Sequence, residues 1–212
     1  WNNQKDLTRV ITMDGGKVTA EVHRMLAEDG VDIFIRDYRI LNILTKIEAT
    51  HQHKGKISEI ASPRKPYGFS GFFIRDKRFY ADATDLTDPV VCYGKGAVGY
   101  VERAEVTTKK EWIDCWKVLT ARANNIGTEL NDDNFNTIIA GPGTICTETY
   151  IVLGADLGLT EQQAHNLSNY MKTKFARLLH ATAKSSQDAA RTTYKFIPLQ
   201  DFTSQSDIDW SQ

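Results

Sequence analysis

The sequence has few of the residues that build disulfide frameworks and zinc clusters. Its three cysteines, Cys92, Cys115 and Cys146, are far apart and odd in number, which argues against both kinds of site and indicates a reducing compartment. No stretch approaches the roughly 18 consecutive apolar residues that a membrane-spanning helix needs. The polar start from Asn2 to Asp6 is not that of a signal peptide. We therefore expect a cytoplasmic protein that has no membrane partner.

Recognisable catalytic motifs are absent as well. The sequence has no Gly-x-Ser-x-Gly nucleophile elbow and no Asp…Glu-x-Lys pattern of metal-dependent nucleases, and residues 141–144 lack the lysine of a phosphate-binding loop. Residues 94–99 match G-x-G-x-x-G, but residues 100–106 favour a strand, whereas a dinucleotide or methyl-donor site needs a helix to begin there. A hairpin with a glycine-rich turn explains these glycines more simply. We predict no catalytic residues, metal ligands or cofactor within this chain.

The chain has 212 residues, of which 41% are hydrophobic and 25% charged, as in an ordinary globular domain. It begins with Trp1 rather than methionine, so we expect a piece of a longer protein. We predict a single domain over residues 1–212, with residues 1–25 as a linking hairpin. The hairpin is indicated by alternating residues on both sides of the turn signal Asp14-Gly15-Gly16.

The remaining pattern indicates an α+β fold. Apolar residues within 38–49 fall on one helical face, and residues 67–118 favour β structure. Thr160 and Gln163 have the spacing of a capping box, which predicts a long amphipathic helix from about Thr160 to Ala183. We therefore expect a mixed, mostly antiparallel central β region followed by a long C-terminal amphipathic helix.

Charge is unevenly distributed, although the net charge is only −1. Residues 123–171 contain six acidic residues and no lysine or arginine, whereas residues 172–195 contain six basic residues and one acidic residue. On the predicted helix, Lys172, Lys174, Arg177, His180 and Lys184 fall on the face opposite to the apolar side chains. This arrangement indicates either a surface for a polyanion or a solvated helix face.

A second group of basic residues is interleaved with aromatic ones. It lies within the seventeen positions from Arg64 to Tyr80, where Phe69, Phe72 and Phe73 also occur. Lysine and arginine neutralise phosphates, and arginine also reads guanine edges. The alternative is a solvated β surface above core phenylalanines. The basic and tyrosine members are Arg64, Lys65, Tyr67, Arg75, Lys77, Arg78 and Tyr80.

Several sequence blocks resemble one known family. They include "LAEDGVDIFIRD" (26–37), "SPRKPYGF" (62–69), "GPGTICTETYIV" (141–152), "YMKTKFARLL" (170–179) and "YKFIPLQDF" (194–202). In this order and spacing, from about residue 26 to the end, they are similar to the C-terminal part of adenine-specific DNA methyltransferases of type II restriction–modification systems. In that family a catalytic Rossmann-like domain precedes a specificity domain.

The resemblance implies that S-adenosylmethionine and the flipped adenine bind in a catalytic domain outside this chain. The family's Asn/Asp-Pro-Pro-aromatic motif is missing, since the sequence contains no Pro-Pro pair. The implied partners are double-stranded DNA and the protein's own methyltransferase domain. The chain departs from the family pattern at residues 70–73 and 180–184, which leaves the individual DNA contacts open.

On this interpretation the chain is a target-recognition domain and not an enzyme by itself. We expect phosphate contacts from Lys172, Lys174, Arg177, Lys184 and Arg191. We expect the other DNA contacts from Arg64, Lys65, Tyr67, Arg75, Lys77 and Arg78. Two alternatives stay open. The chain could contribute to a bifunctional restriction endonuclease and methyltransferase, or it could be a protein-interaction module with an apolar surface of Phe72, Phe73 and Trp112.

Overall fold

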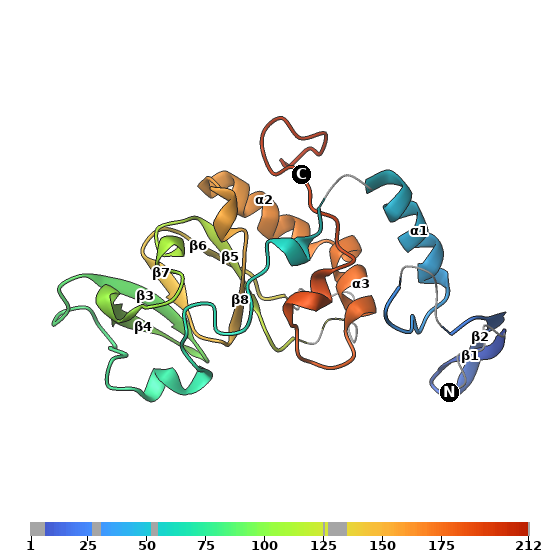
Figure 1. Ribbon diagram of the computed structural model, residues 1–212, viewed down its shortest axis with the longest axis horizontal. Coiled ribbons are helices and arrows are strands. Elements are labelled where there is room, and N and C mark those ends of the chain that lie inside the picture. Colours follow the sequence, from blue (N-terminus) through green and yellow to red (C-terminus); the bar gives the residue numbers. More distant parts are fainter. Residues whose placement is uncertain (1–6, 27–30, 52–54, 125, 127–134, 212) are drawn as a thin grey trace. The chain divides into compact units, whose positions relative to one another are not determined.

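The computed structural model describes residues 7–26, 31–51, 55–124, 126 and 135–211 (Figure 1). The chain divides into two compact units, Trp1–Gln52 and His53–Gln212, where the sequence suggested one domain. Helices occur together with antiparallel-rich sheets, which confirms the α+β class. No helix in the described ranges is long and apolar enough to cross a membrane.

The first unit contains a hairpin and one helix. Strands β1 (Thr8–Asp14) and β2 (Lys17–Arg24) pair in antiparallel fashion, as the sequence predicted for the part of residues 1–25 that is described. Arg9 and Glu21 form an ion pair across the two strands, 2.7 Å apart. Helix α1 (Arg39–His51) matches the expected helix and buries Ile47.

The second unit contains two three-stranded sheets. One has the order β4-β3-β7 and the other β6-β5-β8. Strands β3 and β7 are parallel, and every other pairing in these sheets is antiparallel, so the region is mixed and mostly antiparallel as expected. The strands are β3 (Pro89–Gly94), β4 (Ala97–Glu102), β5 (Lys117–Ala121), β6 (Ile138–Ala140), β7 (Thr144–Cys146) and β8 (Tyr150–Leu153).

The core of the second unit draws buried side chains from both sheets. Val90 and Ile145 come from the first sheet, and Leu119 and Val152 come from the second. Aromatic side chains that precede β3, among them Phe73, belong to the same cluster. The segment before β3 is therefore anchored on the sheets by its own aromatic residues. In the described part of the chain, short 3-10 helices lie between the larger elements: η1 (Ile57–Glu59), η2 (Gly71–Arg75), η3 (Arg103–Glu105), η4 (Lys110–Trp112), η5 (Ala155–Leu157) and η6 (Arg191–Tyr194).

The glycine-rich string at residues 94–99 is the β3–β4 hairpin, as the sequence favoured. Gly96 adopts a φ of +69° in the turn, a conformation that residues with side chains rarely take. Gly99 lies against the chain at Tyr80, where an added Cβ would come within 2.5 Å of the Tyr80 carbonyl oxygen. Tyr80 and Tyr100 pair through backbone hydrogen bonds of 2.9 and 2.8 Å. These glycines therefore serve packing and turn formation.

The predicted long C-terminal helix is wrong, because two helices replace it. Helix α2 (Glu161–Lys172) begins with the expected capping box at Thr160 and Gln163. Thr173 then takes an extended conformation with ψ of 150°, and α3 (Lys174–Ala183) begins after it. The Thr173 hydroxyl donates to the Tyr170 carbonyl at 2.7 Å and accepts from the Ala176 N–H at 3.1 Å. A single side chain thus satisfies backbone groups of both helices, which is how threonine competes with continued helix.

Candidate nucleic-acid interface

The predicted DNA-binding residues lie in two separate parts of the second unit. One part is the loop and 3-10 helix from Arg64 to Arg78, which includes η2. The other is formed by α3 and the flanking residues from Lys172 to Arg191. Figure 1 shows η2 and α3 well apart. The basic residues on η2 and those on α3 therefore come from different parts of the unit.

Most of the basic face predicted for the C-terminal helix is buried. Arg177 is 7% exposed, Lys184 6% and His180 0%. The Lys184 ammonium donates to the backbone carbonyl of Asn124 at 2.8 Å and to the Asn124 side-chain oxygen at 2.5 Å. The prediction that Arg177 and Lys184 contact phosphates is therefore wrong. The break at Thr173 changes which residues of α3 face the core, since Phe175 is exposed while Ala176 and Arg177 are buried.

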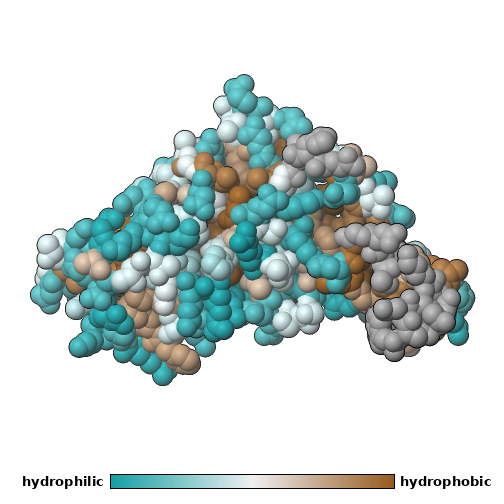
Figure 2. Space-filling view, viewed as in Figure 1, coloured by the Kyte–Doolittle hydropathy of each residue, from teal (hydrophilic) through white to brown (hydrophobic). Residues whose placement is uncertain are grey.

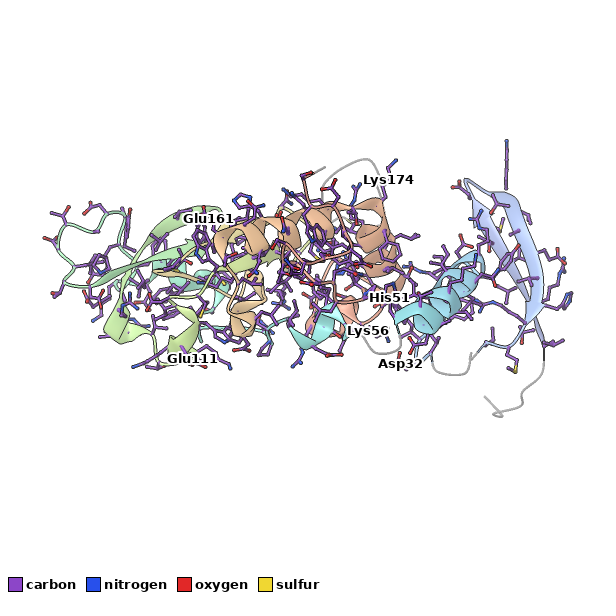
Figure 3. All side chains as sticks on the ribbon, turned by 90° about the horizontal axis from the view of Figure 1, so that it is seen from above. Asp32, His51, Lys56, Glu111, Glu161 and Lys174 are labelled. Atoms are coloured by element: carbon purple, nitrogen blue, oxygen red, sulfur yellow. The ribbon has the colours of Figure 1, made fainter. Side chains whose placement is uncertain are left out.

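Three predicted phosphate-binding residues in this region remain at the surface. Lys172 and Lys174 are exposed at the junction of α2 and α3, and Lys174 lies on the outside of the second unit (Figure 3). Arg191 is also exposed, but its guanidinium donates to the carbonyls of Ser58 at 2.7 Å and Glu59 at 3.4 Å. Arg191 therefore joins η6 to η1 and has less freedom to bind a phosphate.

In the segment from Arg64 to Arg78, two of the arginines are neutralised by carboxylates. Arg64 donates to Glu148 at 2.7 Å. Arg78 pairs with Asp76 at 2.9 Å and with Glu105 at 3.3 Å. The hydrogen bonds from Arg78 lower the pKa of Asp76 to about 2. A DNA phosphate would have to compete with these carboxylates for either arginine.

Tyr67 is also misassigned as a DNA contact. Its ring is buried against Trp112, in edge-to-face geometry with ring centroids 6.4 Å apart. The Tyr67 hydroxyl points to the Trp112 carbonyl at 3.5 Å, and burial raises the Tyr67 pKa. Tyr67 is therefore part of the core. The pattern of residue types gave no sign of this, because tyrosine is common both in cores and at interfaces.

Three predicted DNA-binding cations, Lys65, Arg75 and Lys77, are exposed. Within the described ranges, no carboxylate lies within ion-pair distance of Lys65, Arg75 or Lys77. Lys65 has a φ of +56°, a conformation that is costly for a residue with a side chain. It is held in a turn, where the Gly68 N–H donates to the Lys65 carbonyl at 2.9 Å. These cations are available to an external anion.

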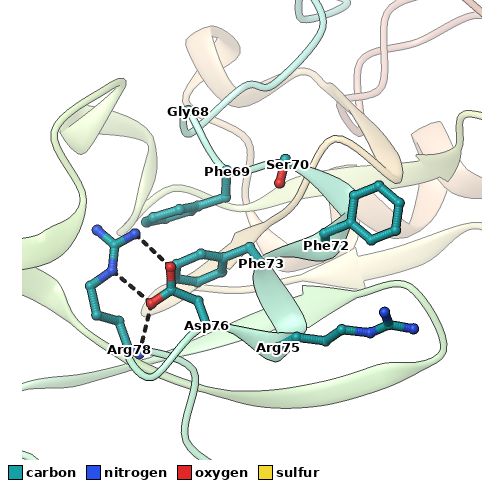
Figure 4. Close-up of a pocket in the computed structure, with 8 residues that line it drawn as sticks. All are labelled: Gly68, Phe69, Ser70, Phe72, Phe73, Arg75, Asp76 and Arg78. Atoms are coloured by element: carbon teal, nitrogen blue, oxygen red, sulfur yellow. Dashed lines mark hydrogen bonds and ion pairs between the residues drawn. The ribbon is translucent and has the colours of Figure 1, made fainter.

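An open hollow of about 620 Å³ adjoins Arg75 (Figure 4). Phe69 and Phe73 stack there with ring centroids 4.0 Å apart. Phe72 and Arg75 point away from this stacked pair (Figure 4), and the Arg75 guanidinium carbon lies 5.9 Å from the centre of the Phe72 ring. Figure 2 shows an apolar area bordered by hydrophilic side chains where η2 lies in Figure 1. The lining residues are Gly68, Phe69, Ser70, Phe72, Phe73, Arg75, Asp76 and Arg78.

The exposed fractions of Phe72, Phe73 and Trp112 test the predicted apolar interaction surface. Phe72 is 72% exposed, whereas Phe73 and Trp112 are buried in the core cluster. The Trp112 indole N–H donates to the Asp156 carboxylate at 2.5 Å. The three residues therefore do not form a shared surface, and Phe72 is the member that a partner can reach.

Glu148 links two segments of this site, and no role for it was predicted from the sequence. Its carboxylate accepts from the Arg64 guanidinium at 2.7 Å and from the Gly71 N–H at 3.0 Å. The hydrogen bond from Arg64 lowers the Glu148 pKa. Glu148 thereby links the Arg64 turn to the first residue of η2. Its position within the block 141–152 was the available signal, but a block shared with a family does not assign a role.

The surface formed by Arg64, Lys65, Phe72, Arg75 and Lys77 is called the η2 surface below. In the part of the chain that the structure describes, no group of three or more His, Cys, Asp or Glu side chains could hold a metal ion. No protein-family model, curated protein or solved structure matches this chain. The function of this chain must therefore be inferred from the site itself.

Proposed function

We propose that this chain binds double-stranded DNA as the target-recognition part of an adenine-specific DNA methyltransferase of a restriction–modification system. The observation that carries the proposal is that Lys65, Arg75 and Lys77 are exposed and that no carboxylate of the described residues lies within ion-pair distance of them, while Arg75 also lies near the exposed Phe72 ring. Unpaired lysines and arginines are the groups that bind the phosphates of a duplex. An arginine at such a surface can also form paired hydrogen bonds with a guanine.

The proposal divides the work between this chain and a catalytic domain outside it. The η2 surface would bind DNA and select the sequence. Lys174 would add a phosphate contact away from the η2 surface. The catalytic domain would supply S-adenosylmethionine, the pocket for the flipped adenine and the methyl transfer. We place the protein in the cytoplasm, where such a system has access to DNA.

The test is fluorescence anisotropy of the 212-residue chain with a labelled mixed-sequence duplex. Affinity should fall steeply between about 50 and about 200 mM salt, because counterions leave the DNA when the protein neutralises phosphates. Replacing Lys65, Arg75 and Lys77 together by glutamine should reduce the slope of log K against log salt by about 2 to 3, since each phosphate contact contributes about 0.9.

Lys110→Gln is the matched control, because Lys110 is exposed in a hollow that it shares with Asp88 and Glu102. This variant removes one positive charge outside the η2 surface and should leave the slope unchanged, whereas each single replacement of Lys65, Arg75 or Lys77 should lower it by about 0.9. If the triple variant binds with the wild-type affinity and slope, the η2 surface is not the DNA-binding surface. If the wild-type chain binds no duplex even at low salt, the proposed function is wrong for this chain.

A further inference from the structure

Phe72 differs from the phenylalanines beside it. Phe69 and Phe73 are buried in the core, but the Phe72 ring is largely exposed at the edge of the hollow. The backbone that carries it is held in place, because the Gly71 N–H donates to Glu148 at 3.0 Å and the Phe73 N–H donates to the Ser70 carbonyl at 3.1 Å. A large apolar ring held exposed on a fixed backbone offers contact area to a partner, and covering the ring would be favourable.

The charges around Phe72 indicate the chemistry of that partner. Arg75 lies near the ring and on the same side of η2 (Figure 4), and Lys77 follows two residues later. Neither cation has a carboxylate partner within the described ranges. A ligand that matches this arrangement combines a flat apolar group with anions beside it. A nucleotide has both, since its base presents a π face and its phosphate is negatively charged.

We propose that the Phe72 ring stacks on a nucleobase that is locally unstacked from the bound duplex, while Arg75 contacts the adjacent phosphate. This inference rests on the proposed DNA-binding function and adds how the DNA is held. Aromatic rings at DNA interfaces stack on bases or enter between base steps in this way. Phe72 and Arg75 both line the open hollow, and both point away from the stacked Phe69 and Phe73 rings (Figure 4).

The experiment compares two labelled duplexes that are identical except that one carries a single unpaired adenine. Opening the stack is least costly at an unpaired base, so the wild-type chain should bind that duplex more tightly. Phe72→Ala should weaken binding to it by about 5- to 150-fold, the range that corresponds to loss of one base–aromatic stack. The salt slope should not change, because this substitution removes no charge. Leu157→Ala is the control, since Leu157 is an apolar side chain that is 41% exposed outside the η2 surface.

Two further variants separate stacking from apolar bulk. Phe72→Trp should retain tight binding, and its added indole fluorescence should be quenched by the unpaired-base duplex relative to wild type. Phe72→Leu keeps an apolar side chain without a π face and should bind as weakly as Phe72→Ala. Circular dichroism and urea unfolding check that each variant is folded.

The outcomes distinguish this inference from the proposed function. If wild type binds both duplexes and either Phe72→Ala or Phe72→Leu binds them with the wild-type affinity, stacking is refuted. DNA binding by the chain is still supported in that case. If Phe72→Trp loses binding and shows no quenching, stacking is refuted as well. If the wild-type chain binds neither duplex, both proposals fail.

Discussion

Buried His180 should make the protein less stable at mildly acidic pH. The ring packs against the rings of Phe135 and Tyr194, with centroid distances of 4.8 and 4.7 Å, and it is 0% exposed. Among the described residues, no hydrogen bond of normal geometry reaches either of its nitrogens. A charged imidazolium at this position would lose its hydration without gaining a compensating partner.

The size of the effect follows from the pKa. Burial, assisted by the nearby charge of Lys184, lowers the pKa of His180 from 6.5 to about 3. Because the folded-state pKa lies below the unfolded one, protons bind preferentially to the unfolded chain. The stability contribution is therefore complete above the unfolded pKa and is lost as the pH falls from 6.5 toward 3. Each pH unit within this window costs at most about 1.4 kcal/mol, which gives a loss of about 2 kcal/mol between about pH 7 and about pH 5.

Urea unfolding followed by circular dichroism measures this loss at each pH. His180→Phe keeps an aromatic ring and removes the titration, so its stability should depend less on pH by about 2 kcal/mol over the same interval. His165→Gln is the control, since His165 lies exposed on α2. The reasoning is refuted if His180→Phe and wild type lose the same stability on acidification, because His180 then does not titrate with the shift that its burial requires.

Two substitutions test the corrected C-terminal helices. Lys184→Met removes the donor to the Asn124 backbone carbonyl and one of the two donors to the Asn124 side-chain oxygen, which also accepts from the Ile126 N–H, so it should lower the free energy of unfolding by about 1–3 kcal/mol; DNA affinity and salt slope should stay at wild-type values, and a reduced slope would place Lys184 at the interface. Thr173→Ala removes the N-cap of α3 and should cost about 0.5–2 kcal/mol in urea unfolding, whereas unchanged stability would mean that the shared cap has no role.

Local sequence signals predicted the local structure well. The turn at residues 14–16 led to the hairpin β1–β2, and the Thr160–Gln163 spacing located the start of α2. The interpretation of residues 94–99 as a hairpin succeeded because the residues after the last glycine favoured a strand. In each case the residues that give the signal are within a few positions of the element that they predict. At this range, backbone conformation and local hydrogen bonds determine the structure.

The break between α2 and α3 could not be derived from periodicity. Apolar residues continue at helical spacing across Thr173, and threonine also occurs inside helices. The structure breaks the helix because the Thr173 hydroxyl bonds to backbone groups on both sides. Once the helix breaks, the face assigned by periodicity no longer applies to α3, and Arg177 is buried instead of Phe175.

The sequence predicted which basic residues occur in the candidate site. It did not predict which of them form ion pairs or which aromatic ring is exposed. The basic residues of the η2 surface were identified from the cluster itself, because exposed cations are common wherever lysine and arginine concentrate. Which of them are paired depends on distant residues, since Arg64 meets Glu148 across 84 positions and Lys184 meets Asn124 across 60. A single sequence carries no signal for such contacts. For the same reason it could not distinguish exposed Phe72 from buried Phe73.

The contact at Gly99 has a consequence for how this surface can change. Phe79 lies against Gly99, where an added Cβ would be 2.6 Å from its ring, and Phe79 in turn packs edge-to-face on Phe73 of η2. A methyl group at position 99 would therefore shift a chain of aromatic rings that ends at η2. The position and angle of the η2 surface could then be altered by a residue that touches no ligand. Variation of binding preference need not be confined to the residues that make contact.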